Sequence, residues 1–69
     1  MIIEKISEYA DGVIVCAIIP SLNGEYENMV FINEKSIIIT LDETIPNGME
    51  NEIEKYIREY IEINKSMIF

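Results

Sequence analysis

The sequence of 69 residues contains no histidine and no tryptophan, and Cys16 is its only cysteine. Without histidine the usual general base of enzymes is missing, and one cysteine provides neither an internal disulfide nor a Cys/His zinc site. Basic residues are also few: five lysines and arginines stand against thirteen aspartates and glutamates, for a net charge of −8. Because phosphate binding needs a basic surface, we expect no direct binding of nucleic acid.

Other catalytic signals are missing as well. Gly12, Gly24 and Gly48 are isolated, so the chain has no phosphate-binding glycine-rich loop, and no Asp-rich calcium loop occurs. Paired carboxylates need a cleft that separates their pKa values, for which a chain of this length has little room. We therefore expect a protein that is not an enzyme and that has no cofactor, no bound metal and no catalytic residues.

The start of the chain lacks the basic residues and the long apolar stretch of a secretory signal. Charged residues interrupt every apolar run, so no membrane span is expected. The sequence thus predicts a soluble cytoplasmic protein, located in the host cytoplasm if it is viral. Cys16 lies in an apolar run with no basic neighbour and is expected to be a buried hydrophobic residue.

Isoleucine is abundant, with sixteen residues against two leucines. Isoleucine and the six asparagines use A/T-rich codons, which indicates an AT-rich genome such as that of a low-GC bacterium, its phage or an archaeal virus. The same β-branched residue favours strands. The composition therefore predicts a fold rich in sheet.

Turn dipeptides divide the first part of the chain into apolar runs. Asp11-Gly12 and Asn23-Gly24 are strong hairpin signals, since a type I′ turn needs a positive φ at both central residues. Residues 33–36 (Asn-Glu-Lys-Ser) form a third turn signal. Pro20 lacks an N–H group, so the second strand is expected to end or bulge there. The predicted strands lie near residues 2–10, 13–20, 26–33 and 36–42.

After residue 48 the apolar spacing changes from two to about 3.6, the repeat of an α-helix. The pairs 54/58 and 55/59 carry opposite charges at i,i+4 spacing on the polar side. The sequence predicts a helix near residues 49–64, with Asn47 or Asn51 as the N-cap and termination near Asn64. Its expected apolar face consists of Met49, Ile53, Tyr56, Ile57, Tyr60, Ile61 and Ile63.

The predicted fold is a single α+β domain spanning residues 1–69, a four-stranded antiparallel meander with one C-terminal amphipathic helix. Residues 2–10 also fit a short helix, with Gly12 at its C-terminus, which would give the order αβββα instead. We prefer the strand, because a helix of eight or nine residues is marginal and Asp-Gly is flanked by residues that favour strands.

Residues 13–19 are apolar without alternation, so both faces of the second strand are apolar. One helix covers only one face of a sheet, and an exposed apolar face is typical of an interface. A domain of this size without disulfides also gains stability by oligomerising. In the αβββα alternative a first helix would cover this face. The sequence predicts a homo-oligomer, at least a dimer, through Ile14, Cys16, Ile18 and Ile38, with either Met29/Phe31 or Val30/Ile32 on the same face.

Acidic residues are expected to gather at one end of the sheet, because the turns of a meander alternate between its two ends. Lys5 is the only basic residue expected near them. We call this group the acidic end: Glu25, Glu27, Asp42, Glu43, Glu50 and Glu52. It fits a role in solubility and in complementing the helix dipole, a docking surface for a basic partner, or a weak divalent cation site.

The first functional hypothesis is a small acidic interaction protein that binds and inhibits or masks a larger basic protein. In size, charge and A/T-rich coding the chain resembles the small antagonist proteins that phages and other mobile elements use against host nucleases and defence complexes. The resemblance implies a host nuclease or defence complex as the partner. Two alternatives are a structural or assembly subunit that oligomerises through the apolar sheet face, and a small-ligand sponge. The shortage of lysine and arginine disfavours a phosphate-bearing ligand for the sponge.

Overall fold

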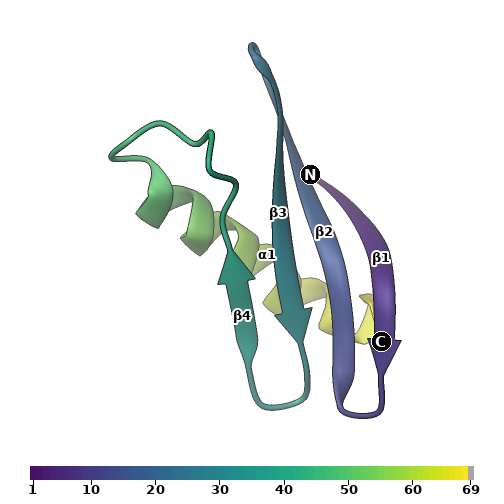
Figure 1. The fold of residues 1–69 in the computed structure, drawn as a ribbon. Helices are drawn as coiled ribbons and strands as arrows, with labels where there is room; N and C mark the ends of the chain where they lie inside the picture. Colours follow the sequence, from purple (N-terminus) through teal and green to yellow (C-terminus); the bar gives the residue numbers. More distant parts are fainter. Residues whose placement is uncertain (69) are drawn as a thin grey trace.

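The computed structural model describes residues 1–68 and shows four strands followed by one helix (Figure 1). The strands are antiparallel and lie side by side in chain order. This arrangement confirms the four-stranded α+β meander, and the N-terminal segment is a strand rather than a helix. The elements are β1 (Ile2–Tyr9), β2 (Gly12–Ser21), β3 (Gly24–Ile32), β4 (Ile37–Thr40) and α1 (Glu50–Ile68).

The first two hairpin turns lie one residue before the predicted dipeptides, with Ala10-Asp11 and Leu22-Asn23 at their centres, and their conformations also differ from the prediction. Ser21 pairs with Gly24, and within residues 1–68 no residue other than glycine has a positive φ. A type I′ turn is therefore wrong at both Asp11-Gly12 and Asn23-Gly24. The Ser21 hydroxyl instead holds the second turn, donating to the Gly24 carbonyl (3.0 Å) and accepting from the Asn23 N–H (3.3 Å), while Gly24 takes a φ of 131°.

The β2–β3 hairpin projects beyond its neighbours at one end of the sheet (Figure 1). β1 begins opposite Ile18 and β4 ends opposite Met29, so the last part of the hairpin has no strand beside it. Pro20 lies in this part, paired with Glu25. β2 therefore continues through Pro20 to Ser21, because no adjacent strand needs the missing N–H.

Side chains on one face of the sheet form the core with α1, which lies behind the strands in Figure 1. We call this face the inner face. Val15, Ala17, Val30 and Ile32 on this face are fully buried. The buried core residues are Val13, Val15, Ala17, Val30, Ile32, Ile37, Ile45, Ile53, Ile57 and Ile61.

The helix is longer and its buried stripe is narrower than predicted. Only Ile53, Ile57 and Ile61 are buried, whereas Tyr56 and Ile63 are exposed. These three occur every fourth residue, the spacing that keeps side chains on one line of a helix facing a flat sheet. Of the other residues of the predicted face, Tyr60 is half-buried and Met49 is exposed.

Both predictions about the ends of α1 are wrong. The helix begins at Glu50, so Met49 precedes it, and its carbonyl accepts from the Ile53 N–H (3.0 Å). Neither Asn47 nor Asn51 is the N-cap. Asn64 does not end the helix, because its side-chain amide donates to the Tyr60 carbonyl one turn earlier (2.8 Å) and the helix continues to Ile68.

A buried asparagine joins β3 to the loop that leads into α1. Asn28 is fully buried on the inner face, and its amide donates to the carbonyls of Ala17 (3.1 Å) and Tyr26 (3.3 Å). Its side-chain oxygen accepts from the Asp42 N–H (2.9 Å). Buried polar groups are stable only when they are hydrogen-bonded, and here both amide N–H donors and the amide oxygen have partners. The bond to Asp42 fixes the start of the loop.

Candidate functional site

The face of the sheet turned away from α1, which we call the outer face, is not covered by any helix or strand of the described chain (Figure 1). The strand register decides which residues it carries, because directly paired residues lie on the same face. Ile18 pairs with Ile2 and Glu27, and Phe31 pairs with Ile14 and Ile38. The main outer-face residues are Ile2, Glu4, Tyr9, Ile14, Cys16, Ile18, Glu27, Met29, Phe31 and Ile38.

All four residues predicted for an oligomer interface lie on the outer face, but they differ in exposure. Ile38 is 59% exposed and Ile14 is half-buried, whereas Cys16 (6%) and Ile18 (7%) are almost covered. The expected burial of Cys16 is therefore confirmed, whereas the expectation of an exposed apolar face is wrong for Ile18. They belong to β2, which has a strand on each side, so neighbouring side chains cover them. A partner would first contact the residues around them.

Exposed apolar side chains surround this covered centre on both sides. On β1, Ile2 and Tyr9 are 53% and 55% exposed, and on β3, Met29 is 40% exposed. The sequence left open which pair of β3 residues shares the face, and the register assigns Met29 and Phe31 to it. Isolated exposed apolar residues are ordinary, but a set that joins across four strands is typical of a binding surface.

Two aromatic rings pack against each other at one corner of the outer face. The Tyr9 and Phe31 rings meet edge to face, with centroids 6.4 Å apart and an angle of 63°. Gly12 lies beside the Phe31 ring, where a Cβ atom would be 2.8 Å from the ring and would also clash with the Ile32 carbonyl oxygen. Gly12 thus allows a close approach of backbone and ring, a role for which the sequence gives no separate signal.

Negative charge flanks the apolar centre. Glu4 on β1 pairs with Cys16, and Glu27 on β3 pairs with Ile18. Burial raises the pKa of the Cys16 thiol, and the carboxylates of Glu27, Glu4 and Asp42 raise it further. Neither lysine nor arginine occupies an outer-face position of the four strands. The outer face therefore combines an apolar centre with carboxylates.

The structure brings together only part of the predicted acidic end. The Asp42 carboxylate accepts from the Glu27 N–H (2.7 Å), which joins these two residues. The Glu50 carboxylate accepts from the Gly48 N–H (2.8 Å) at the start of α1. Glu25, Glu43 and Glu52 are exposed side chains. Among residues 1–68 no group of three acidic or thiol side chains is placed to hold a metal ion.

Asp42 has a structural role that the sequence did not indicate. Its carboxylate accepts from the Thr44 hydroxyl (2.6 Å) and the Thr44 N–H (2.8 Å), as well as from the N–H of Glu27. The hydrogen bond from the Thr44 hydroxyl is the main cause that lowers the pKa of Asp42, followed by the two backbone N–H groups. Reversal of Asp42 to lysine would therefore remove these hydrogen bonds as well as change the surface charge.

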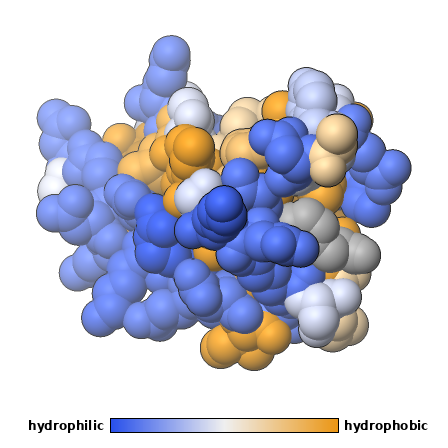
Figure 2. Space-filling view, turned by 90° about the horizontal axis from the view of Figure 1, so that it is seen from below, coloured by the Kyte–Doolittle hydropathy of each residue, from blue (hydrophilic) through white to orange (hydrophobic). Residues whose placement is uncertain are grey.

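Lysines gather at the opposite end of the molecule, where most of the surface is hydrophilic (Figure 2). An open groove of about 1060 Å³ lies there between the β1–β2 turn, the β3–β4 turn and the C-terminal part of α1. Lys5 was expected near the acidic end but lines this groove, with its ammonium 2.8 Å from the Glu8 carboxylate. The charged lining residues are Lys5, Lys35, Lys65, Glu8, Asp11 and Glu34. Their opposite charges balance, so the groove selects neither anions nor cations.

No helix in the described residues is long and apolar enough to cross a membrane. The chain matches no known protein family, no curated protein and no solved structure at a significant level.

Proposed function

We propose that this protein is a small acidic, non-catalytic interaction protein that binds a larger basic protein through the outer face and masks the bound surface. The observation that supports this proposal is that the outer face carries both an apolar centre and flanking carboxylates. Cys16 and Ile18 form that centre, Glu4 and Glu27 flank it, and Ile38 is exposed beside it.

The two kinds of group have separate roles in binding. Burial of the exposed apolar side chains supplies affinity, at about 25 cal/mol per Å² of apolar surface. Carboxylates attract a basic surface and raise the association rate, and they disfavour acidic partners. From the sequence, the acidic end and the apolar face are two separate candidate binding surfaces. Glu27 lies on the outer face and its N–H donates to the Asp42 carboxylate, so these two members of the acidic end adjoin the apolar centre.

Strongly basic protein surfaces are typical of nucleic-acid-binding proteins, and covering such a surface would block nucleic-acid binding. Such surfaces carry clustered lysine and arginine to neutralise phosphates, and an acidic protein competes for the same charges. A nuclease or a nucleic-acid-binding defence complex of the host is therefore the partner class that we propose. It agrees with the resemblance of the chain, in size and charge, to phage and mobile-element antagonists.

The proposal is tested by capturing the partner from the source host with the native protein and with surface variants. We expect Ile38→Lys and the double reversal Glu25→Lys/Glu27→Lys each to abolish capture. Ile63→Lys and Glu62→Lys are the matched controls, because both residues are exposed on α1. Capture should also weaken between ~50 and ~500 mM salt, because salt screens exposed charges. Capture that persists with both outer-face variants would refute the proposal.

The second candidate function is an assembly subunit that pairs two outer faces. Exposed Ile2 and Ile38 on opposite edges of this face favour it. The charge of −8 on each chain opposes it, because carboxylates such as Glu27 would face one another across the contact. Sedimentation at about 100 μM separates the candidates: a single species of 8.0 kDa excludes the assembly subunit, whereas a dimer that Ile38→Lys dissociates supports it.

A further inference from the structure

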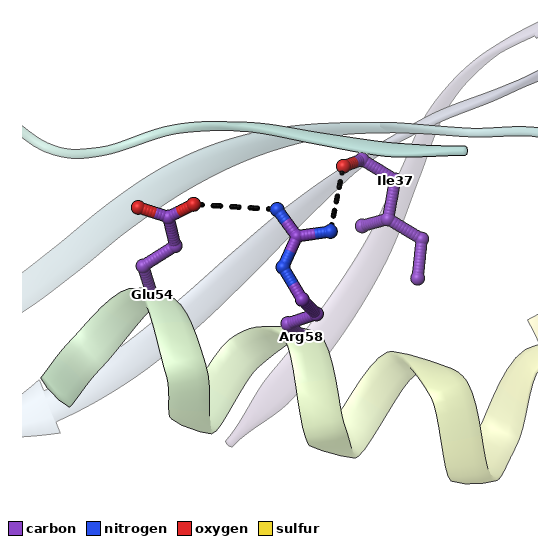
Figure 3. A network of polar contacts seen from close by, with 3 residues as sticks. All are labelled: Ile37, Glu54 and Arg58. Carbon is purple, nitrogen blue, oxygen red and sulfur yellow. Dashed lines mark hydrogen bonds and ion pairs between the residues drawn. The ribbon is translucent and has the colours of Figure 1, made fainter. Parts of the chain in front are cut away.

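Sheet proteins often bind partners by adding a strand to a free edge, but β4 has only four residues and one carbonyl on its edge is already bonded. Asn33 donates to the Ser36 carbonyl in the turn, so the next pair, Ile32 and Ile37, directs its backbone groups away from each other. The Ile37 carbonyl thus lies on the free edge of β4. The Arg58 guanidinium donates one N–H to this carbonyl (3.0 Å) and another to the Glu54 carboxylate (3.2 Å), as Figure 3 shows.

The β1 edge is also unsuited to strand addition. Its register shifts between Lys5 and Ser7, which indicates a β-bulge. The ion pair between Lys5 and Glu8 lies beside this bulge. Bulges and charged side chains are devices that keep another strand from pairing with an edge. A partner therefore has the outer face available rather than an edge.

The charges on the outer face are spaced to suit a helix. Glu4 and Glu27 lie on the two strands that flank β2, one on each side of the apolar row formed by Ile14, Cys16 and Ile18. Neighbouring strands are about 4.8 Å apart, so the two flanking strands are separated by about 10 Å. An α-helix with its side chains is about 10–12 Å wide. A helix lying along β2 would have one carboxylate on each side.

We propose that the outer face binds an amphipathic α-helix of the partner, which lies over the β2 row with its apolar stripe in contact with the accessible side chains there and beside it, Ile14, Met29 and Ile38, and with a lysine or arginine on each side, next to Glu4 and Glu27. This inference rests on the proposed function and specifies the partner element. A second copy of this chain fits this site less well. Its α1 exposes Tyr56, Ile63 and Met67, but the exposed carboxylates of Glu59 and Glu62 on the same helix would be repelled by Glu4 and Glu27.

A designed peptide of about 18 residues provides the probe, with a leucine stripe flanked by lysines and alanine elsewhere. One control peptide has the same composition in an order that forms no stripe, and another carries glutamate in place of lysine. Binding is followed by NMR of the protein and by circular dichroism of the peptide. We expect saturable binding of the first peptide only, a gain of helix in that peptide, and perturbations centred on Ile14, Met29 and Ile38.

Protein variants test the two components of the surface. Glu4→Gln/Glu27→Gln should weaken the peptide about three- to thirtyfold, as two exposed ion pairs are lost. Ile38→Lys should weaken it by a similar or greater factor, since it adds a cation beside the stripe. Glu34→Gln/Glu62→Gln and Ile63→Lys should leave binding unchanged, because these exposed residues lie elsewhere.

Three results would overturn the inference: equal binding of the stripeless peptide, binding of the glutamate peptide, or perturbations centred on α1. The outcome is separate from that of the proposed function. If no designed helix binds but Ile38→Lys still abolishes capture of the natural partner, the helix proposal fails and the proposed function stands. If Ile38→Lys affects neither the peptide nor the capture, both fail.

Discussion

Replacement of Asn28 by alanine is the most informative test of how the outer face and the acidic end are held together. Asn28 makes three hydrogen bonds in the fully buried interior, two donated to β-strand carbonyls and one accepted from the Asp42 N–H. The same Asp42 binds the Glu27 N–H through its carboxylate. Loss of the Asn28 amide therefore removes the hydrogen bond that joins the 41–49 loop to β3.

The magnitude follows from these three bonds. A buried hydrogen bond contributes about 0.5–1.5 kcal/mol, and a buried donor left without an acceptor costs about 1–3 kcal/mol. Asn28→Ala removes all three bonds and leaves the Asp42 N–H without its acceptor, so we expect a loss of about 2–4 kcal/mol. The total stability of a chain of this length is roughly 3–10 kcal/mol. The variant should therefore be marginally folded.

Urea unfolding followed by circular dichroism measures this loss, and hydrogen exchange at the Asp42 amide locates it. The exchange of that amide should accelerate more than the exchange of amides in the β1–β2 hairpin. Asn51→Ala is the matched control, an exposed asparagine on α1 that should change the unfolding free energy by no more than about 0.5 kcal/mol. If Asn28→Ala unfolds within about 0.5 kcal/mol of the native protein, the reasoning about this network is refuted.

Three further predictions concern the helix, the loop and the sheet edge. Ile57→Asp should abolish cooperative unfolding, because an unpaired carboxylate at this fully buried position costs several kcal/mol. Glu62→Ala, on the exposed side of the helix, should change the unfolding free energy by no more than about 0.5 kcal/mol. Equal melting of the two variants would contradict the helix orientation. The pKa of Asp42 is lowered from its ordinary value of 3.8, so its contribution to stability is present above that value and is lost as the pH falls through the lower folded-state pKa. Asp42→Asn should remove this part of the acid dependence, and superimposable pH profiles would show that the carboxylate is not held as described. Arg58→Met should cost about 1 kcal/mol and increase concentration-dependent association, since the Ile37 carbonyl loses its donor; sedimentation that shows no new association would argue against edge protection by Arg58.

Several features of the fold could be predicted because they depend on local patterns. The turn signals at Asn23-Gly24 and residues 33–36 lie between apolar runs, and the 3.6-residue spacing after residue 48 marks the helix. Even so, the turn type was missed, because the φ angles depend on how the flanking strands meet. The end of the helix was missed at Asn64, whose amide bonds to its own helix backbone.

The candidate surface could be predicted only in part. The apolar run 13–19 indicated a second apolar face, but the identity of its neighbours depended on the strand register. A shift by one residue would have placed Val30 and Ile32 on the outer face instead of Met29 and Phe31. Glu4 was not recognised as part of this surface, since its position opposite Cys16 follows from the same register.

The sequence alone determined the order of strands and helix, the buried stripe around Ile57 and the excess of negative charge, because periodicity and composition are local properties. Only the tertiary structure decided that Asp42 is a hydrogen-bonded part of the loop rather than a free surface charge, and that Arg58 bonds the Ile37 carbonyl on the β4 edge. The Asp42–Thr44 hydrogen bonds are local, but the Glu27–Asp42 and Arg58–Ile37 hydrogen bonds join residues fifteen and twenty-one positions apart. Such contacts are fixed by the packing of the helix and loop against the sheet, to which neither residue type nor spacing points.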